Sequence, residues 1–297
     1  MTLPPPAQDQ AYCDVSALEA GVIELPLNIF LQEEDPASTR KDIAPSLSFL
    51  LQHNKRPEKF IFDLGIRKDF EKYPPTVNQW IKTVFPVQVP EDPVDNLAKG
   101  NLSPNEIDYV CLSHLHFDHV GNPSLFPRST FLVGAEGKSL LTPGYPADPD
   151  AGFASDLLPE GRTRFLDSTG WQPLGPFPRA LDFYGDGSLY IVDSPGHLPG
   201  HVNLVARTSA DGAWIFLGGD CAHHWTLVTG ECTIAEGRPG FANGCAHVDK
   251  KASEQHLARI REFLKQPRTR VLLGHDSPWY KAHRGGPSFF PGKIESK

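Results

Sequence analysis

The sequence predicts an α/β domain in which layers of strands are covered by helices. Apolar runs rich in β-branched and aromatic residues recur along the chain, and a Gly or Pro follows most of them, as is typical of strands that lead into loops. Two segments carry apolar residues every three to four positions, the spacing of an amphipathic helix. The 297 residues suffice for one large core, so we expect a single catalytic domain over residues 1–297.

Several segments have the composition of strands. They lie at 22–30, 47–51, 60–65, 107–113, 130–134, 189–193, 202–206, 214–218 and 271–274. Helices are expected at 76–84 and, from a more regular pattern, at 252–265, where Leu257, Ile260 and Leu264 recur among charged residues. No internal repeat of fixed period interrupts this alternation of strands and helices.

Residues 142–180 have a different composition. Prolines alternate with glycines there, and apolar residues show little periodicity. A loop of that length inside a compact domain is either functional or disordered. Because Phe153, Phe165 and Trp171 supply apolar anchors, we expect an irregular insertion that packs as a lid or pocket wall.

The charge balance narrows the class of partner. The chain has 28 Lys and Arg against 36 Asp and Glu, a net charge of -8. Binding to nucleic acid or to an anionic membrane surface usually needs a basic patch, so we expect a small neutral or weakly charged substrate instead. The N-terminal residues lack a basic and apolar leader pattern, and no run approaches the roughly 20 apolar residues of a membrane span. The expectation is a soluble, cytoplasmic protein, and the sequence does not indicate its oligomeric state.

Cysteine usage agrees with a reducing compartment. The five cysteines are odd in number, scattered and without a C-x-x-C pair, so free thiols are expected rather than a disulfide framework. Cys221 follows an aspartate that we interpret as a metal ligand. Neighbouring side chains on a strand diverge, which favours a packing role for this thiol.

The strongest functional signal is the run S-H-L-H-F-D-H at 113–119. It places three imidazoles and a carboxylate within six residues after an apolar run. His114 and His116, two positions apart, point to the same side, whereas Asp118 and His119 lie past the turn and face a second point. Two metal ions fit this arrangement better than one. A solvated surface loop is the plain alternative and would be the natural interpretation of a lone histidine.

Further metal-ligand candidates follow other predicted strands. His197, Asp220 and His275 each come after an apolar run and a glycine. The glycines permit sharp turns and close backbone approach, so these side chains can meet at one edge of a sheet. Imidazole and carboxylate ligands suit two divalent ions such as Zn²⁺, Fe²⁺ or Mn²⁺.

These motifs resemble the metallo-β-lactamase superfamily. S-H-L-H-F-D-H followed by P-G-H-L-P-G-H is similar to its lactonase branch in particular, and the resemblance covers about residues 60–275. It implies an αββα sandwich, with two facing mixed sheets and outer helices, and a dinuclear site, usually zinc, at one edge of the sheets.

The resemblance also implies a role for each motif residue. One metal would be held by His114, His116 and His197, the other by Asp118, His119 and His275, with Asp220 as a bridge. Asp63, in the position of the family's Asp-x-Gly turn, and His201 would be hydrogen-bonding groups outside the ligand set. The metals would share a hydroxide that attacks a carbonyl, while Asp118 could transfer a proton to the leaving group.

One position departs from the lactonase pattern. Several of those enzymes have a tyrosine three residues after the bridging aspartate, where this chain has His223. We expect His223 or His224 to line the pocket and meet the substrate carbonyl, with a structural role for both as the alternative. Trp225 and Tyr280 are further candidates for substrate contact. The ring that is opened could therefore be a lactone, a lactam or a cyclic carbamate.

The leading hypothesis is a dinuclear metallohydrolase that opens a small cyclic ester or cyclic amide. Alternatives are a thioesterase of the glyoxalase-II type, an aryl-ester or phosphotriester hydrolase, and a non-catalytic metal-binding protein. A thioesterase should carry Lys or Arg for its anionic carrier, whereas the region after Asp220 has mainly His and aromatic residues before Arg238. The acidic balance opposes a nuclease. An iron redox enzyme would normally replace a first-motif histidine with a carboxylate.

Overall fold

The computed structural model describes residues 2–241 and 243–297, and two six-stranded sheets form its centre. The first sheet has the spatial order β1 (Cys13–Leu18), β4 (Ser48–His53), β5 (Lys59–Phe62), β7 (Tyr109–Cys111), β8 (Thr130–Gly134) and β9 (Thr163–Leu166). The second has the order β10 (Gln172–Leu174), β11 (Phe177–Asp182), β12 (Leu189–Asp193), β13 (Val202–Arg207), β14 (Trp214–Leu217) and β15 (Thr269–Leu272). Both sheets mix parallel and antiparallel pairs.

A small third sheet and the helices complete the fold. The small sheet has the order β3 (Lys41–Pro45), β2 (Val22–Pro26) and β6 (Val87–Gln88). The α-helices are α1 (Leu27–Phe30), α2 (Pro75–Thr83), α3 (Pro93–Lys99), α4 (Phe117–Val120), α5 (Trp225–Thr229), α6 (Lys250–Leu264) and α7 (Ser277–His283). Among the residues described, no helix combines the length and apolar character needed to cross a membrane.

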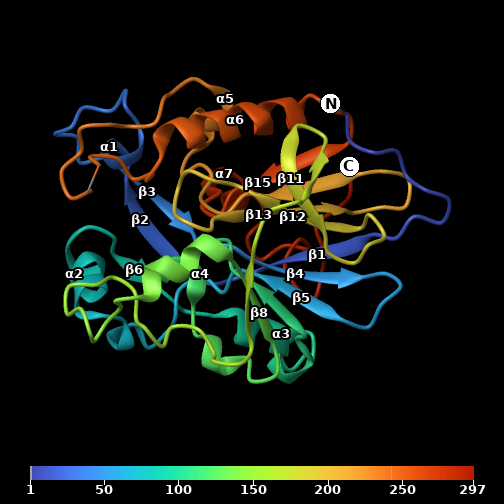
Figure 1. Ribbon diagram of the computed structural model, residues 1–297, viewed down its shortest axis with the longest axis horizontal. Coiled ribbons are helices and arrows are strands. Elements are labelled where there is room, and N and C mark those ends of the chain that lie inside the picture. The colour runs from blue at the N-terminus through green and yellow to red at the C-terminus, as the bar shows by residue number, and fades with distance from the viewer. Residues whose placement is uncertain (1, 242) are drawn as a thin grey trace.

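Alternation of side chains along the strands builds the layers. In β4, Phe49 and Leu51 pack between the two large sheets, whereas Leu50 packs on the opposite face, in the cluster that contains Leu97 of α3. Strands buried on both faces are apolar throughout, which explains the continuous apolar runs in the sequence. Figure 1 shows α6 above the second sheet and α3 below the first. The predicted αββα sandwich is confirmed.

Helix α6 lies where its pattern predicts and covers the second sheet with its apolar stripe. Leu257, Ile260 and Phe263 are buried in one cluster with Val205 of β13. The Asp249 carboxylate accepts a hydrogen bond from the Ala252 amide at 2.9 Å and so caps the start of the helix.

The segment 22–30, predicted as one strand, divides into β2 and α1. Pro26 ends the strand because it lacks the N–H that continued pairing would require, and α1 begins at the next residue. Strands β1 and β3 were not predicted. The prediction for 142–180 is also corrected, because this segment contains β9, β10 and the start of β11. Pro173 is tolerated in β10 because β10 is an edge strand.

Candidate metal centre

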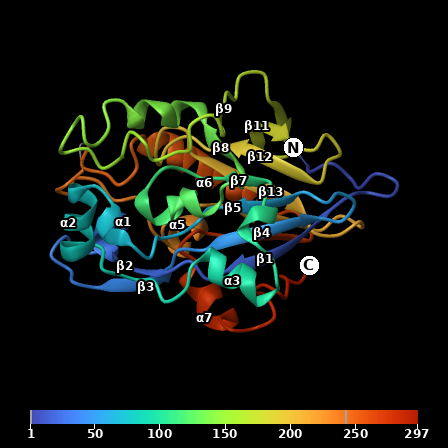
Figure 2. The same ribbon diagram turned by 90° about the horizontal axis from the view of Figure 1, so that it is seen from below.

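The candidate ligands come from both large sheets and meet beyond the ends of their strands. The 113–119 run follows β7 and continues into α4, where Asp118 and His119 occupy the first turn. His197 follows β12, Asp220 follows β14, and His275 follows β15. Figure 2 shows α1, α2 and the small sheet gathered at one end of the sandwich, with the chain termini toward the other.

One ligand cluster consists of His114, His116, His197 and Asp220. Nδ1 of His116 lies 2.9 Å from Nε2 of His114 and 3.0 Å from Nε2 of His197. Oδ2 of Asp220 lies 3.7 Å from His114 Nε2 and 3.5 Å from His197 Nε2. Four ligands about 2.1 Å from one zinc ion in tetrahedral geometry would be roughly 3.4 Å apart, so these spacings fit a single ion.

A second cluster consists of Asp118, His119, His275 and again Asp220. Oδ1 of Asp220 lies 3.0 Å from His119 Nε2 and 3.3 Å from His275 Nε2, which in turn is 3.3 Å from Asp118 Oδ2. Nε2 of His119, Nε2 of His275 and Oδ1 of Asp220 are buried without a hydrogen-bond partner. Buried polar atoms normally have partners, so this donor set fits a divalent cation.

Outer hydrogen bonds fix the orientation of the ligands. Oδ2 of Asp63 lies 2.8 Å from His119 Nδ1, and the same carboxylate accepts hydrogen bonds from both the amide and the hydroxyl of Ser113. His275 Nδ1 donates to the Pro45 carbonyl at 2.8 Å. His201 Nε2 accepts from the backbone amide of Asp220 at 3.1 Å. Partners of this kind set the ring tautomer and raise ligand basicity.

The first cluster is built from neutral imidazoles. Burial lowers the pKa of His114 and of His197 well below the ordinary value, and it lowers the pKa of His116 to about 4. A histidine must be unprotonated to bind a metal, so these three rings are already in the binding form near neutral pH.

The second cluster concentrates negative charge. Burial lowers the pKa of His119, but the carboxylates of Asp220, Asp63 and Asp118 outweigh it and raise this pKa well above its ordinary value. Against the same effect of burial, Asp220 and Asp118 raise the pKa of His275 to about 10. An environment that holds cationic imidazoles so strongly also attracts a metal cation, which would displace their protons.

A cavity of about 300 Å³ opens over both clusters. Its floor includes His116, Asp118, Asp220 and His275. Its walls are mostly apolar and carry five aromatic side chains: Phe30, Trp80, Phe85, Phe117 and Phe241. Among the described residues that line it, the only Asp, Glu, Lys or Arg side chains are those of Asp118 and Asp220, both in the ligand clusters.

Of the predicted substrate contacts, the structure places only His223 in this cavity. Its ring stacks on Phe30 with centroids 4.1 Å apart, and its Nε2 lies 3.2 Å from Asp220 Oδ2. His224 does not line the cavity, because its Nδ1 accepts from the Thr226 amide and caps α5.

Trp225 and Tyr280 likewise do not line the cavity. Trp225 packs against the apolar cluster that contains Leu257 of α6. The Tyr280 hydroxyl donates to Glu19 Oε2 at 2.6 Å, and its ring packs between the sheets. Proximity in sequence to Asp220 and His275 was misleading because the turn of a following helix carries each side chain away from the cavity.

His247 was not among the residues predicted from the sequence. This buried imidazole lies against His197 and His223, with ring centroids 4.9 and 5.2 Å away respectively. It follows no predicted strand and belongs to no H-x-H pattern. The one sequence signal near it is Asp249, two residues later, which caps the start of α6.

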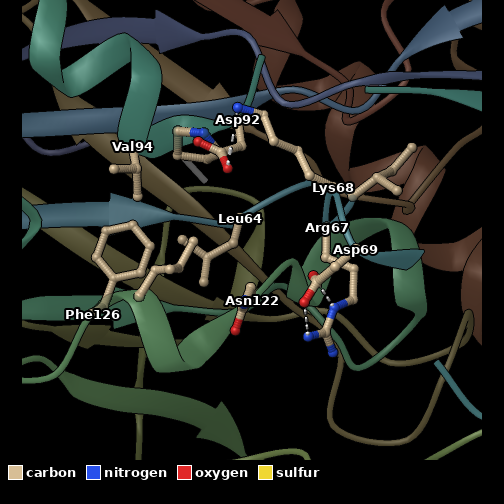
Figure 3. Close-up of a pocket in the computed structure, with 11 residues that line it drawn as sticks. Leu64, Arg67, Lys68, Asp69, Asp92, Val94, Asn122 and Phe126 are labelled. Atoms are coloured by element: carbon tan, nitrogen blue, oxygen red, sulfur yellow. Dashed lines mark hydrogen bonds and ion pairs between the residues drawn. The ribbon is translucent and has the colours of Figure 1, made fainter. Parts of the chain in front are cut away.

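A second cavity, of about 240 Å³, lies away from the ligand clusters (Figure 3). Its charged groups pair with one another, with Arg67 Nε 2.8 Å from Asp69 Oδ1 and Lys68 Nζ 3.8 Å from Asp92 Oδ2. Leu64, Val94 and Phe126 supply its apolar lining. None of the candidate metal ligands lines it, so the chemistry belongs to the first cavity.

Comparison with known proteins agrees with this fold. A family model described as the metallo-beta-lactamase superfamily matches residues 44–213, more than half of the chain. The chain belongs to this superfamily. In overall structure it is similar to an N-acyl homoserine lactone hydrolase solved with the product N-hexanoyl-L-homoserine at its catalytic metal centre, with a TM-score of 0.69 and 18% identity over all of both chains.

Several relatives have more similar sequences. The chain is 42% identical to gamma-lactamase MBL2 of Gibberella moniliformis over 170 residues, which are 55% of this chain and 70% of that protein. It is 38% identical to metallo-hydrolase mfmC of Annulohypoxylon moriforme over 233 residues, which are 74% of this chain and 60% of that protein. It also matches 27% of the length of the cytochrome P450 monooxygenase mpaDE of Penicillium roqueforti, at 35% identity over 75% of this chain. The chain therefore spans only part of several of its relatives.

Proposed function

We propose that this chain is a hydrolase that holds two divalent metal ions, with zinc as the expected metal, and opens a small uncharged cyclic ester or cyclic amide. The observation that carries the proposal is the position of the two ligand clusters, which share Asp220 on the floor of an apolar, aromatic cavity. The names of a γ-lactamase relative and of a lactone hydrolase with a similar fold support this reaction class.

The cavity wall supports an uncharged substrate with an apolar flank. A carrier such as glutathione or coenzyme A bears anionic groups that Lys or Arg would have to meet, and the described lining residues include neither. Trp80 and Phe241 are placed to contact a flat apolar group, while Asp118 and His223 remain near the ring to be opened. The thioesterase alternative is therefore less well supported than ring opening.

The chain's own residues divide the work. Bound metals would supply Lewis acidity and make water nucleophilic near neutral pH. His223 presents Nε2 beside Asp220 and would donate a hydrogen bond to the substrate carbonyl, while stacking on Phe30 holds its ring in place. Asp118 faces the cavity next to His275 and would carry a proton to the leaving oxygen or nitrogen. The apolar walls would keep bulk water from the reacting bond.

A neutral aryl ester or phosphotriester is the second candidate. Such a substrate lacks charge as well, and the same cavity would accept it. Discrimination between the candidates requires a panel in which ring and open-chain esters carry the same aromatic group.

The test is mass-spectrometric detection of water addition by the zinc-loaded chain. The panel comprises lactones, lactams, cyclic carbamates, aryl esters, phosphotriesters and thioesters, each with and without a chelator. We expect ring opening that is lost on chelation and in His116→Ala and Asp118→Ala, whereas Tyr280→Phe, altered outside the cavity, should turn over normally. Full hydrolysis by Asp118→Ala would contradict the assigned roles, and turnover of thioesters alone would contradict the proposed substrate class.

A further inference from the structure

A third group of imidazoles lies behind the first ligand cluster. His197, His223 and His247 each place one ring nitrogen within 4.8 Å of a ring nitrogen of the other two, and all three rings are buried. Nδ1 of His197, Nδ1 of His223 and Nε2 of His247 have no hydrogen-bond partner. Each of these three adjoining rings therefore has an unpartnered buried nitrogen, which is costly unless something satisfies it.

The backbone fixes His247 against His197. The amide of Val248 donates to the His197 carbonyl at 3.1 Å, and the amide of Asp249 donates to the Gly196 carbonyl at 2.8 Å. Gly196 makes this approach possible, because its φ is +135° and an added Cβ would lie 2.3 Å from Ser253 Oγ. The loop that carries the metal ligand and the segment that leads into α6 are thus joined by two hydrogen bonds.

A side-chain contact fixes the ring of His247 as well. Ser253 Oγ, in the first turns of α6, lies 3.0 Å from His247 Nδ1. If that ring donates from Nδ1 to the serine, the lone pair is on Nε2, the unpartnered atom. In that tautomer His247 accepts a hydrogen bond at Nε2.

Nδ1 of the metal ligand His197 needs such an acceptor, whereas the corresponding nitrogens of three other ligands already have a partner. Nδ1 of His114 has Ser113 Oγ, Nδ1 of His119 has Asp63, and Nδ1 of His275 has the Pro45 carbonyl. Nδ1 of His197 has no direct partner in the described part of the chain, although its Nε2 faces the first metal cluster. Metal-bound imidazoles almost always donate their other N–H to an acceptor.

We propose that His247 is a positioning residue that holds the metal ligand His197 through one buried water molecule. The water accepts a hydrogen bond from Nδ1–H of His197 and donates its two protons to Nε2 of His247 and Nδ1 of His223. Three nitrogens about 2.8 Å from one water oxygen are up to roughly 4.6 Å apart, and rings whose centroids lie 4.9 to 5.2 Å apart can bring their nitrogens that close. The arrangement satisfies every unpartnered nitrogen of the group and places the proton of His223 on Nε2, the nitrogen beside Asp220 Oδ2.

The inference rests on the metal site of the proposed function, but its test does not depend on hydrolysis. Zinc retained per chain is measured against a graded chelator for the wild-type chain, His247→Phe and His247→Gln. Phenylalanine keeps the ring volume and removes both nitrogens, whereas glutamine can return an acceptor near the position of Nε2. His53→Phe is the matched control, because His53 is also a buried hydrogen-bonded imidazole but lies outside the ligand clusters.

We expect His247→Phe to weaken retention of one zinc ion by about 10–100-fold, the usual effect of removing an outer partner. His247→Gln should recover most of that loss, and His53→Phe should retain zinc as the wild type does. If His247→Phe does not fold, Ser253→Ala tests the same chain of hydrogen bonds and should weaken retention in the same direction.

Equal zinc retention in His247→Phe and His53→Phe would overturn the proposal. So would a wild-type chain with three zinc ions of which His247→Phe loses one, because the three nitrogens would then bind an ion directly. A chain that shows the expected zinc losses but opens no ring would refute the proposed function and leave the role of His247 intact.

Discussion

Replacing Asp63 with asparagine is the sharpest test of how the second ligand cluster is supported. Three donors converge on this buried carboxylate: the Ser113 amide meets Oδ1 at 2.6 Å, while the Ser113 hydroxyl and His119 Nδ1 each meet Oδ2 at 2.8 Å. An amide offers only one acceptor oxygen. In its better orientation it keeps the two contacts at Oδ2 and turns its NH₂ group toward the Ser113 amide, so one buried donor loses its partner.

The magnitude follows from that count. A buried donor left unpaired costs about 1–3 kcal/mol of unfolding free energy. Loss of the charged partner of His119 should also weaken zinc binding by about 10–100-fold, or about 1.4–2.8 kcal/mol. Backbone strain should be the same in the wild type and in Asp63→Asn. Asp63 has φ +60°, and asparagine adopts this left-handed conformation as readily as aspartate does.

The assay combines chelator competition with urea unfolding of the metal-free chain. Asp186→Asn is the matched control, because Asp186 also contacts a histidine and a serine but lies outside both ligand clusters. Its carboxylate lies 3.0 Å from His53 Nε2 and accepts hydrogen bonds from the Ser188 amide at 3.1 Å and the Ser188 hydroxyl at 2.5 Å. The Asp186→Asn variant should have a lower free energy of unfolding than the wild type and should bind zinc as tightly. If Asp63→Asn retained zinc as tightly as Asp186→Asn, the argument that Asp63 supports His119 would be refuted.

Other predictions follow from groups outside the ligand clusters. Burial raises the pKa of Cys13 to about 12, so its thiolate fraction at pH 8 is on the order of 10⁻⁴. The half-buried Cys232 should therefore be the first thiol to react with a disulfide reagent in the folded chain. An unchanged fast phase of the reaction in Cys232→Ser would contradict this. Tyr280→Phe should lower the unfolding free energy by about 1.5–3 kcal/mol, since its hydroxyl donates to the Glu19 carboxylate, and should leave the KM of any hydrolysed substrate unchanged. Asp220→Asn should lower the zinc content at both positions, because both clusters use this carboxylate; loss of only one ion in metal analysis would argue against a shared ligand.

The sequence predicted the sandwich and the gathering of ligand candidates because both depend on local patterns. Strands β8 and β12 have the predicted bounds, since each is a short apolar run that ends at a turn residue or an acid. His197, Asp220 and His275 could be found because a ligand that directly follows a core strand is placed by that strand. They could be recognised without knowing how distant segments of the chain pack together.

Contacts made by helices and long loops were not predictable in the same way. Tyr280 was expected near the substrate because it lies close to His275 in sequence, but α7 turns its side chain toward Glu19. His247 was missed for the opposite reason. Its role near His197 depends on backbone hydrogen bonds between segments about fifty residues apart, which no local periodicity reveals.

The glycines before Asp220 and His275 have a second function that becomes clear only in three dimensions. Gly219 has φ +47°, and an added Cβ would lie 2.7 Å from Ser113 Cβ; one added at Gly274 would lie 2.9 Å from His119 Cε1. Neither residue offers a ligand, yet a methyl group at either would push the first sheet's ligands away from those of the second. The G-D and G-H pairs therefore do more than allow a turn. They set the distance between the two sheets at the edge where Asp220 serves both clusters, so the metal centre depends on the packing of the sandwich as much as on its ligands.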